Sequence, residues 1–175
     1  MLRYVCAGLA LAILSTGAQA DDKHEHKDGA KNPALEKLKK LSGEWVAVDD
    51  KGKEQLVSVF KVTSAGSAVQ ETIFPGGPME MVSMYHVDGK DLIMTHYCAL
   101  GNQPRMKLDP KSTDKELKFV FAGGTNLDPA KDMHMHEGSI TIIDDDHIEW
   151  KWAGYDQGKP AEGHGVSMKL ERKKK

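Results

Sequence analysis

Cysteine is scarce in this 175-residue chain, and its scarcity excludes several kinds of protein. Only Cys6 and Cys98 are present, and Cys6 lies in an N-terminal segment that we expect to be removed. Cys98 would then be the single thiol, which excludes an intrachain disulfide. The chain also has no C-x-x-C-H motif, which excludes covalently attached c-type haem. Stability must therefore come from burial of apolar side chains.

Long apolar runs are also lacking. The run at residues 5–14 is too short to span a bilayer. Arg3 precedes it and the A-x-A sequence Ala18-Gln19-Ala20 follows it, a pattern typical of an export signal. We therefore expect residues 1–20 to be a signal peptide. The mature protein is predicted to be periplasmic or secreted, without stable membrane insertion.

A strong charge of one sign is absent too. The formal net charge is −2, and removal of Arg3 with the leader would make it −3. This balance indicates neither a nucleic-acid nor a polyanion partner. Residues 21–31 are charged, lack apolar periodicity and are predicted to be flexible. The remaining residues, 32–175, fit a single domain, which we expect to be a monomer.

Helical periodicity is confined to one short segment. Asn32-Pro33 predicts a helix start, Leu35, Leu38 and Leu41 form an apolar stripe, and Ser42-Gly43 predicts its end. From residue 44 onward, strand-like segments alternate with Gly-, Asp- and Pro-containing turns. The predicted strands are 44–49, 54–63, 68–74, 79–87, 91–99, 103–108, 116–122, 133–143, 147–153 and 164–172.

Alternation within these strands predicts the fold class. Apolar side chains occupy one face and charged side chains the other, as in residues 117–121 and 147–153. Such half-exposed strands belong to antiparallel sheets. About ten of them in tandem, joined by short turns, favour a mainly β fold. The predicted fold is an antiparallel up-and-down β-barrel with a short N-terminal helix, and a two-sheet sandwich is the alternative.

The first predicted strand carries a resemblance. A short helix leading into Gly43-Glu44-Trp45 resembles the G-x-W opening of the calycin superfamily, the lipocalins and their relatives. The resemblance implies that Trp45 packs at the closed end of a barrel and that a basic residue near the last strand, here Arg172, covers it. The ten-strand count is similar to the fatty-acid-binding and nitrobindin-type barrels. No haem- or lipid-binding residue of these families can be aligned onto this chain.

Residues 91–105 contain most of the unusual chemistry. His96, Tyr97 and Cys98 stand side by side, and a turn rich in amide groups follows them. Alternation places His96 and Cys98 on one face and Tyr97 on the other. Because the turn follows this strand directly, we expect its polar side chains to lie at one barrel end. The predicted ligand-binding residues are His96, Tyr97, Cys98, Asn102, Gln103 and Arg105.

His134 and His136 suggest a second kind of site. They lie two residues apart on a predicted strand, so they should share a face with Ile140, which is apolar and expected to face inward. Two imidazoles on one strand can provide two ligands to a metal, and His96 is the natural third. The metal-site prediction therefore names His134, His136 and His96, with a transition metal or haem as the cofactor.

Two functions remain open from the sequence. The first is an exported small-molecule-binding barrel that holds an apolar or amphipathic ligand in an interior supplied with methionines. The alternative is a metal- or haem-binding protein that uses the three histidines. An enzyme is not favoured, because same-face neighbours such as His96 and Cys98 lie roughly 6–7 Å apart on a strand, beyond hydrogen-bond reach. No catalytic residue is predicted.

Overall fold

The structure, a computed structural model, describes residues 32–174. The predicted signal peptide (1–20) and flexible segment (21–31) lie outside these residues. Among the described residues there is one α-helix, α1 (Pro33–Lys40), and one 3₁₀ turn (Ser64–Gly66). The strands are β1 (Gly43–Val48), β2 (Glu54–Thr63), β3 (Ala68–Ile73), β4 (Met81–Asp88), β5 (Asp91–Tyr97), β6 (Gln103–Leu108), β7 (Glu116–Thr125), β8 (His134–Ile142), β9 (His147–Asp156), β10 (Lys159–Pro160) and β11 (Val166–Arg172).

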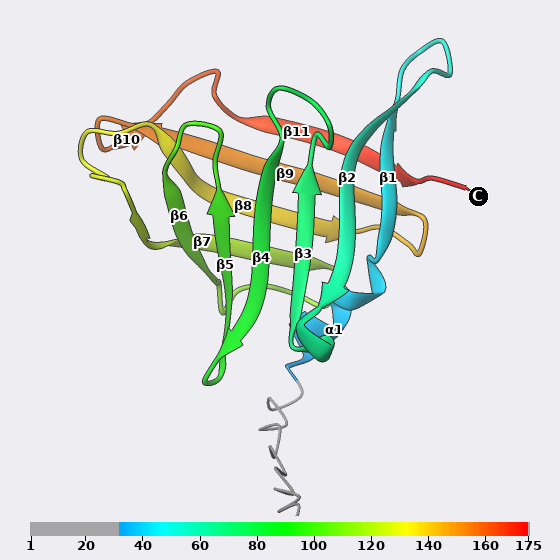
Figure 1. Ribbon diagram of the computed structural model, residues 1–175, viewed down its shortest axis with the longest axis horizontal. Helices are drawn as coiled ribbons and strands as arrows, with labels where there is room; N and C mark the ends of the chain where they lie inside the picture. Colours follow the sequence, from blue (N-terminus) through cyan, green and yellow to red (C-terminus); the bar gives the residue numbers. More distant parts are fainter. Residues whose placement is uncertain (1–31, 175) are drawn as a thin grey trace, which may run out of the picture.

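The strands form one closed antiparallel barrel. Each strand from β1 to β9 pairs with the next along the chain, β9 pairs with β11, and β11 pairs with β1. Ten strands thus close the ring, and the two-residue β10 adds only to the edge of β9. Figure 1 shows β2 to β6 upright in front, with β7, β8, β9 and β11 running nearly horizontally behind them. The predicted barrel is confirmed, whereas β10 was not predicted.

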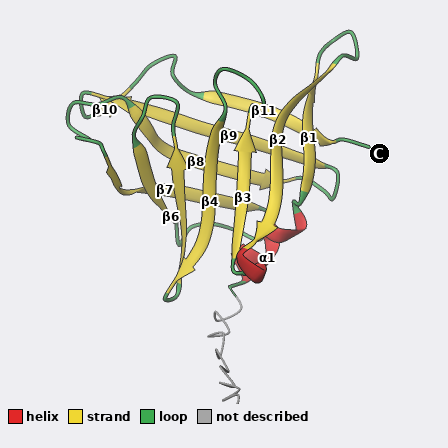
Figure 2. Cartoon of the chain, in the orientation of Figure 1, coloured by secondary structure: helices red, strands yellow, loops and turns green. Residues whose placement is uncertain are grey.

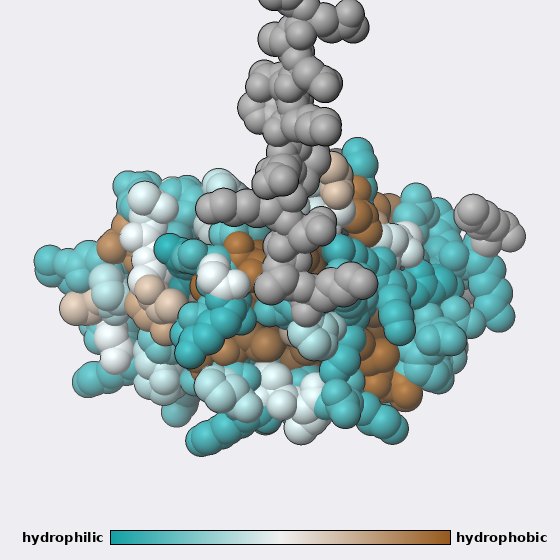
Figure 3. Space-filling view, turned by 90° about the horizontal axis from the view of Figure 1, so that it is seen from below, coloured by the Kyte–Doolittle hydropathy of each residue, from teal (hydrophilic) through white to brown (hydrophobic). Residues whose placement is uncertain are grey.

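Helix α1 lies against one end of the barrel, beside β2 and β3 (Figure 2). The side chain of Asn32 caps it by accepting two backbone N–H bonds from the first turn, at 3.0 and 3.2 Å. Leu35, Leu38 and Leu41 are buried, as their spacing predicts. In the view onto this end, hydrophobic residues gather toward the middle and hydrophilic residues surround them (Figure 3). No described helix has the length and apolar character needed to span a bilayer.

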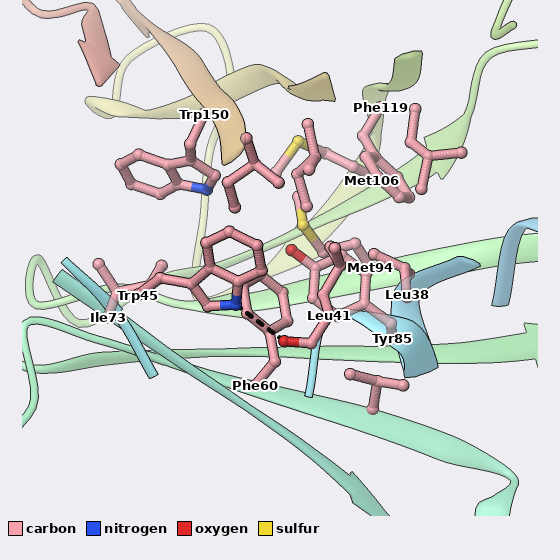
Figure 4. Close-up of a cluster of buried hydrophobic side chains, with 14 of the residues drawn as sticks. Leu38, Leu41, Trp45, Phe60, Ile73, Tyr85, Met94, Met106, Phe119 and Trp150 are labelled. Atoms are coloured by element: carbon pink, nitrogen blue, oxygen red, sulfur yellow. Dashed lines mark hydrogen bonds between the residues drawn. The ribbon is translucent and has the colours of Figure 1, made fainter. Parts of the chain in front are cut away.

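Trp45 and Arg172 connect the helix to the first and last strands. The Trp45 indole N–H donates to the Leu41 carbonyl at 2.8 Å (Figure 4), and the Arg172 guanidinium lies 4.4 Å from the centre of the Trp45 ring. Arg172 also donates to the backbone carbonyls of Ser42 and Lys40, at 2.8 and 3.1 Å. Arg172 thus covers the Trp45 ring, a geometry compatible with a calycin-like barrel.

The barrel interior is filled by large side chains from most strands and from α1. Trp45, Phe60, Tyr85, Met94, Met106, Phe119 and Trp150 belong to one continuous buried cluster (Figure 4). Burying one such side chain stabilises the fold by roughly 1.5–3 kcal/mol. The same packing leaves little free space inside the barrel, and this limits which ligands the interior can hold.

Candidate functional site

A fully buried carboxyl group lies inside the barrel. Glu71, on β3, has no exposed surface and shares its face with the core residues Val69 and Ile73. Its two oxygens accept hydrogen bonds from the Ser58 hydroxyl at 2.8 Å and from the Tyr85 hydroxyl at 2.6 Å. Both donors are neutral. Burial raises the pKa of Glu71 to about 7, against the lowering effect of the two hydrogen bonds.

A second polar contact lies on the two strands that follow. The Ser83 hydroxyl of β4 is 3.0 Å from Nδ1 of His96 on β5, and both residues are buried. Burial lowers the pKa of His96 to about 4, so its imidazole is neutral at pH 7. Burial also raises the pKa of Tyr85 well above its ordinary range, and the nearby charge of Glu71 adds to this effect. Neither His96 nor Tyr85 therefore carries a charge at neutral pH.

These polar groups border a small internal cavity of about 10 Å³. A volume of this size holds one water molecule. Its wall includes the polar residues Glu71, Ser83, Tyr85, Ser139 and Lys151, and Met94 and Met135 contribute flexible apolar side chains. Trp152 also lines the cavity, and its indole N–H is buried without a hydrogen-bond partner among the described residues. An unpaired buried donor of this kind is costly, and a bound group could satisfy it.

The residues predicted at the end of β5 divide between the inside and the outside of the barrel. His96 is buried, and Cys98 is half-buried against the core cluster, as the alternation predicts. Tyr97 is 50% exposed. Arg105 also lies on the surface, where it pairs with Asp88 at 2.8 Å instead of bordering the interior. Because its register partner Thr95 alternates with the buried Met94, Arg105 is directed away from the core.

Asn102 is the most constrained residue of the predicted turn. Its side chain is buried, with 5% exposure, and its side-chain N–H donates to the Met133 carbonyl at 2.8 Å. Its side-chain oxygen is buried without a partner among the described residues. Asn102 and Met133 line an open recess of about 460 Å³ between this turn and the loop before β8. Gln103, by contrast, bonds within its own turn, to the Gly101 carbonyl at 3.0 Å.

The two histidines of β8 differ from the sequence prediction. We expected His134 and His136 to share the inward face with Ile140. Instead, a β-bulge shifts the register of β8 against β9 between Met135 and Glu137. The extra residue reverses the alternation, so that Met135 joins the core together with Ile140. His134 is nevertheless buried, whereas His136 is half-buried. A bulge of this kind has no reliable sequence signal here, so strict alternation misses the inward position of Met135.

His134 and His136 instead form a hydrogen-bonded pair. Nδ1 of His134 is 2.7 Å from the Asp132 carbonyl, and Nε2 of His134 is 3.0 Å from Nδ1 of His136. A carbonyl can only accept, so Nδ1 of His134 carries the hydrogen. Neutral His134 must then accept at Nε2, His136 must donate from Nδ1, and Nε2 of His136 keeps a free lone pair. The His136 ring is stacked between Phe121 and Tyr155, at 4.7 and 3.7 Å between centroids.

The three predicted metal ligands are not brought together as one group. Among residues 32–174, no set of three or more His, Cys, Asp or Glu side chains converges as a metal site. His96 contacts Ser83, while His134 and His136 contact each other. Burial and the neighbouring His134 lower the pKa of His136.

Sequence reasoning missed the four residues around the internal carboxyl: Ser58, Glu71, Ser83 and Tyr85. A signal for one of them was present. In strand 68–73, Glu71 lies two residues from both Val69 and Ile73 and so shares their face, which predicts an acidic side chain on an inward face. The partners of Glu71 could not be found in this way, because alternation within a strand does not give the register between neighbouring strands.

A larger open hollow, of about 700 Å³, lies on the sheet formed by β7, β8, β9 and β11. It shares Trp152 and Gly138 with the wall of the small cavity, but Glu71, Ser83 and Tyr85 do not line it. Exposed lysines such as Lys118 and Lys151 border it. Its size alone does not make it the functional site. The sequence matches no protein-family profile and no curated protein.

Proposed function

We propose that this protein is an exported small-molecule-binding barrel of the calycin-like type, which holds an apolar or amphipathic ligand in its interior. The observation that carries this proposal is the carboxyl of Glu71, which is fully buried and has two neutral hydrogen-bond donors but no cation beside it. A buried carboxyl without a cationic partner opposes folding, so its presence in a core needs a reason other than stability. Perturbed ionisable groups in an enclosed site are typical of ligand-binding and active sites.

The surrounding side chains support this proposal. The cavity next to Glu71 has a volume of about 10 Å³, which admits only a small polar head group in the described packing. An apolar body would have to displace Met94 and Met135, which line the same cavity. Methionine is suited to this, because its unbranched side chain adopts several packed conformations at small energetic difference. The Trp45–Arg172 contact supports the calycin-like assignment of the barrel.

A glycine in the cavity wall provides a direct test. A Cβ atom added at Gly138 would lie 3.9 Å from Cε of Met94, which is ordinary van der Waals contact. Gly138→Ala should therefore be tolerated, whereas the larger side chain of Gly138→Val should occupy the space that a ligand needs. We expect native mass spectrometry of untagged protein to detect a bound organic molecule in the wild type and in Gly138→Ala, and a reduced amount in Gly138→Val.

The neutral dye Nile red gives an independent readout on protein that has been stripped of ligand by organic extraction and refolded. Wild-type protein and Gly138→Ala should enhance its fluorescence, and Gly138→Val should enhance it less. Equal dye binding by folded Gly138→Val and Gly138→Ala would contradict an interior site. Absence of both a copurifying molecule and dye binding would refute the proposed function itself.

The histidine pair favours a second candidate, the binding of haem or a transition metal. The lone pair on Nε2 of His136, oriented by His134 and the Asp132 carbonyl, is typical of an imidazole ligand held by an outer hydrogen bond. Haem iron needs only one or two protein ligands, because the porphyrin supplies four nitrogens. Metal analysis and the visible spectrum after haem addition test this candidate. If this candidate is correct, the wild type should show bound metal or a haem spectrum, and His136→Ala should lose it.

A further inference from the structure

The charge of the barrel interior restricts the ligand's polar group. The buried polar and charged side chains among the described residues are Ser58, Glu71, Ser83, His96, Asn102 and His134, and no lysine or arginine is among them. Lys151 borders the internal cavity, but its ammonium group pairs with Glu149 at 2.8 Å on the partly exposed surface. The interior therefore offers one acid and no cation.

The hydrogen bonds of Glu71 leave further acceptor capacity. Each carboxylate oxygen can accept about two hydrogen bonds, and each accepts one here, from Ser58 or from Tyr85. An incoming group that donates hydrogen bonds can thus be added without displacing either partner. A carboxylate in the same place would face the Glu71 carboxyl without a cation to compensate its charge. Like charges at such short range strongly disfavour each other in a buried site.

The volume of the internal cavity also selects the head group. About 10 Å³ is space for a group of the size of water. An ammonium or hydroxyl group has this size, whereas a carboxylate with its two oxygens is larger. The adjoining wall formed by Met94, Met135 and Phe119 is apolar and suits an alkyl chain or a ring attached to that group.

We propose that the interior selects amphipathic amines, and more weakly alcohols, and rejects fatty acids, with Glu71 accepting hydrogen bonds from the ligand head group. This inference rests on the proposed interior binding function and names the ligand class of that site. It departs from what the resemblance to fatty-acid-binding barrels implies, because the buried charge here has the sign that repels a carboxylate.

The pH dependence of binding follows from the groups around Glu71. Its own pKa is about 7, that of His96 is about 4, and that of Tyr85 is far above neutrality. Between pH 6 and 8, only Glu71 of these three changes its charge, and its ionised fraction rises about tenfold. An alkylammonium ion remains charged over this range. Its affinity should therefore increase with pH by up to about tenfold, while the affinity of an alcohol should fall or stay constant.

The test compares octylamine, octanol and octanoate, which share a chain length and differ in head group. Binding to ligand-stripped wild-type protein is measured by calorimetry and by the fluorescence of Trp150 and Trp152, which line the cavity. At pH 7.5, octylamine should bind at least about tenfold more tightly than octanoate, since one buried charge contact is worth that much. Glu71→Gln should reduce this preference to within about threefold.

A matched control variant separates the loss of the buried carboxyl from a general effect of charge removal. Glu54→Gln removes an exposed carboxyl from β2, and it should keep the wild-type preference. If Glu71→Gln does not fold, the pH dependence of octylamine binding by the wild type still decides the question.

The possible outcomes distinguish this inference from the proposed function. Octanoate binding as tightly as octylamine, or a preference that Glu71→Gln leaves unchanged, would overturn the amine assignment while interior binding stood. Affinity for octylamine that falls between pH 6 and 8 would also overturn it. Failure of all three compounds to bind, together with failure to bind Nile red, would refute interior binding and with it this inference.

Discussion

Replacing Glu71 by glutamine should change how the stability of the barrel depends on pH. Burial raises the pKa of Glu71 from its ordinary value of 4.5 to about 7 in the folded protein. The folded state therefore holds a proton that the unfolded state releases between pH 4.5 and 7. In this window the wild type loses about 1.4 kcal/mol of stability per pH unit, and the loss is complete above pH 7.

The magnitude follows from the size of the pKa change. A rise from 4.5 to about 7 corresponds to about 3 kcal/mol of unfolding free energy, an order-of-magnitude value for a group without solvent exposure. Glutamine has the same shape and no charge at any pH. The stability of Glu71→Gln relative to the wild type should therefore increase by about 3 kcal/mol between pH 4.5 and 8. In a domain of this size that corresponds to roughly 6–12 °C in the thermal midpoint.

The assay is urea unfolding of both proteins at pH 4.5, 5.5, 6.5, 7.5 and 8, followed by tryptophan fluorescence. The quantity of interest is the difference between the two unfolding free energies at each pH, because the other titrating groups cancel in it. Glu54→Gln, which alters an exposed carboxyl on β2, is the matched control and should show a nearly constant difference. A constant difference for Glu71→Gln as well would refute the reasoning, since it would mean that the folded protein ionises Glu71 at its ordinary pKa.

Three other predictions concern the rest of the molecule. Arg172→Ala should destabilise the fold by about 2–3 kcal/mol in urea unfolding, because it removes hydrogen bonds to the Ser42 and Lys40 carbonyls and the contact with Trp45. Lys173→Ala breaks only an exposed ion pair with Glu44 and should destabilise the fold much less, so equal losses would contradict this prediction. ¹⁵N NMR at pH 8 should find the hydrogen on Nδ1 in both His134 and His136, and an Nε2-protonated His134 would contradict the assigned pair. N-terminal sequencing of the exported protein should begin at Asp21, and a mature chain that retains residues 2–20 would disprove the predicted leader.

The sequence by itself determined the secondary structure and the mainly β, antiparallel fold class. Turn residues and two-residue alternation are local properties, so they define the strands and their inward faces before any tertiary contact is known. The predicted order of ten strands and the capped helix before them agree with the structure, and His96 lies on the opposite face from Tyr97, as alternation predicts. The sequence also distinguished antiparallel from parallel sheet, since each strand has one charged face. It did not decide between a barrel and a sandwich, because closure depends on whether β11 pairs with β1.

Only the tertiary structure decided which polar groups meet. Glu71, Ser58 and Tyr85 come from three strands and lie 13 and 14 residues apart in sequence, so no local pattern predicts their hydrogen bonds. The bulge in β8 is similarly invisible to alternation, and it adds Met135 to the core, while His134 is buried and His136 is half-buried. The burial that shifts the pKa of Glu71 depends on every strand of the closed ring. A local sequence pattern specifies the direction of a side chain, whereas its electrostatic environment depends on residues contributed from the whole barrel.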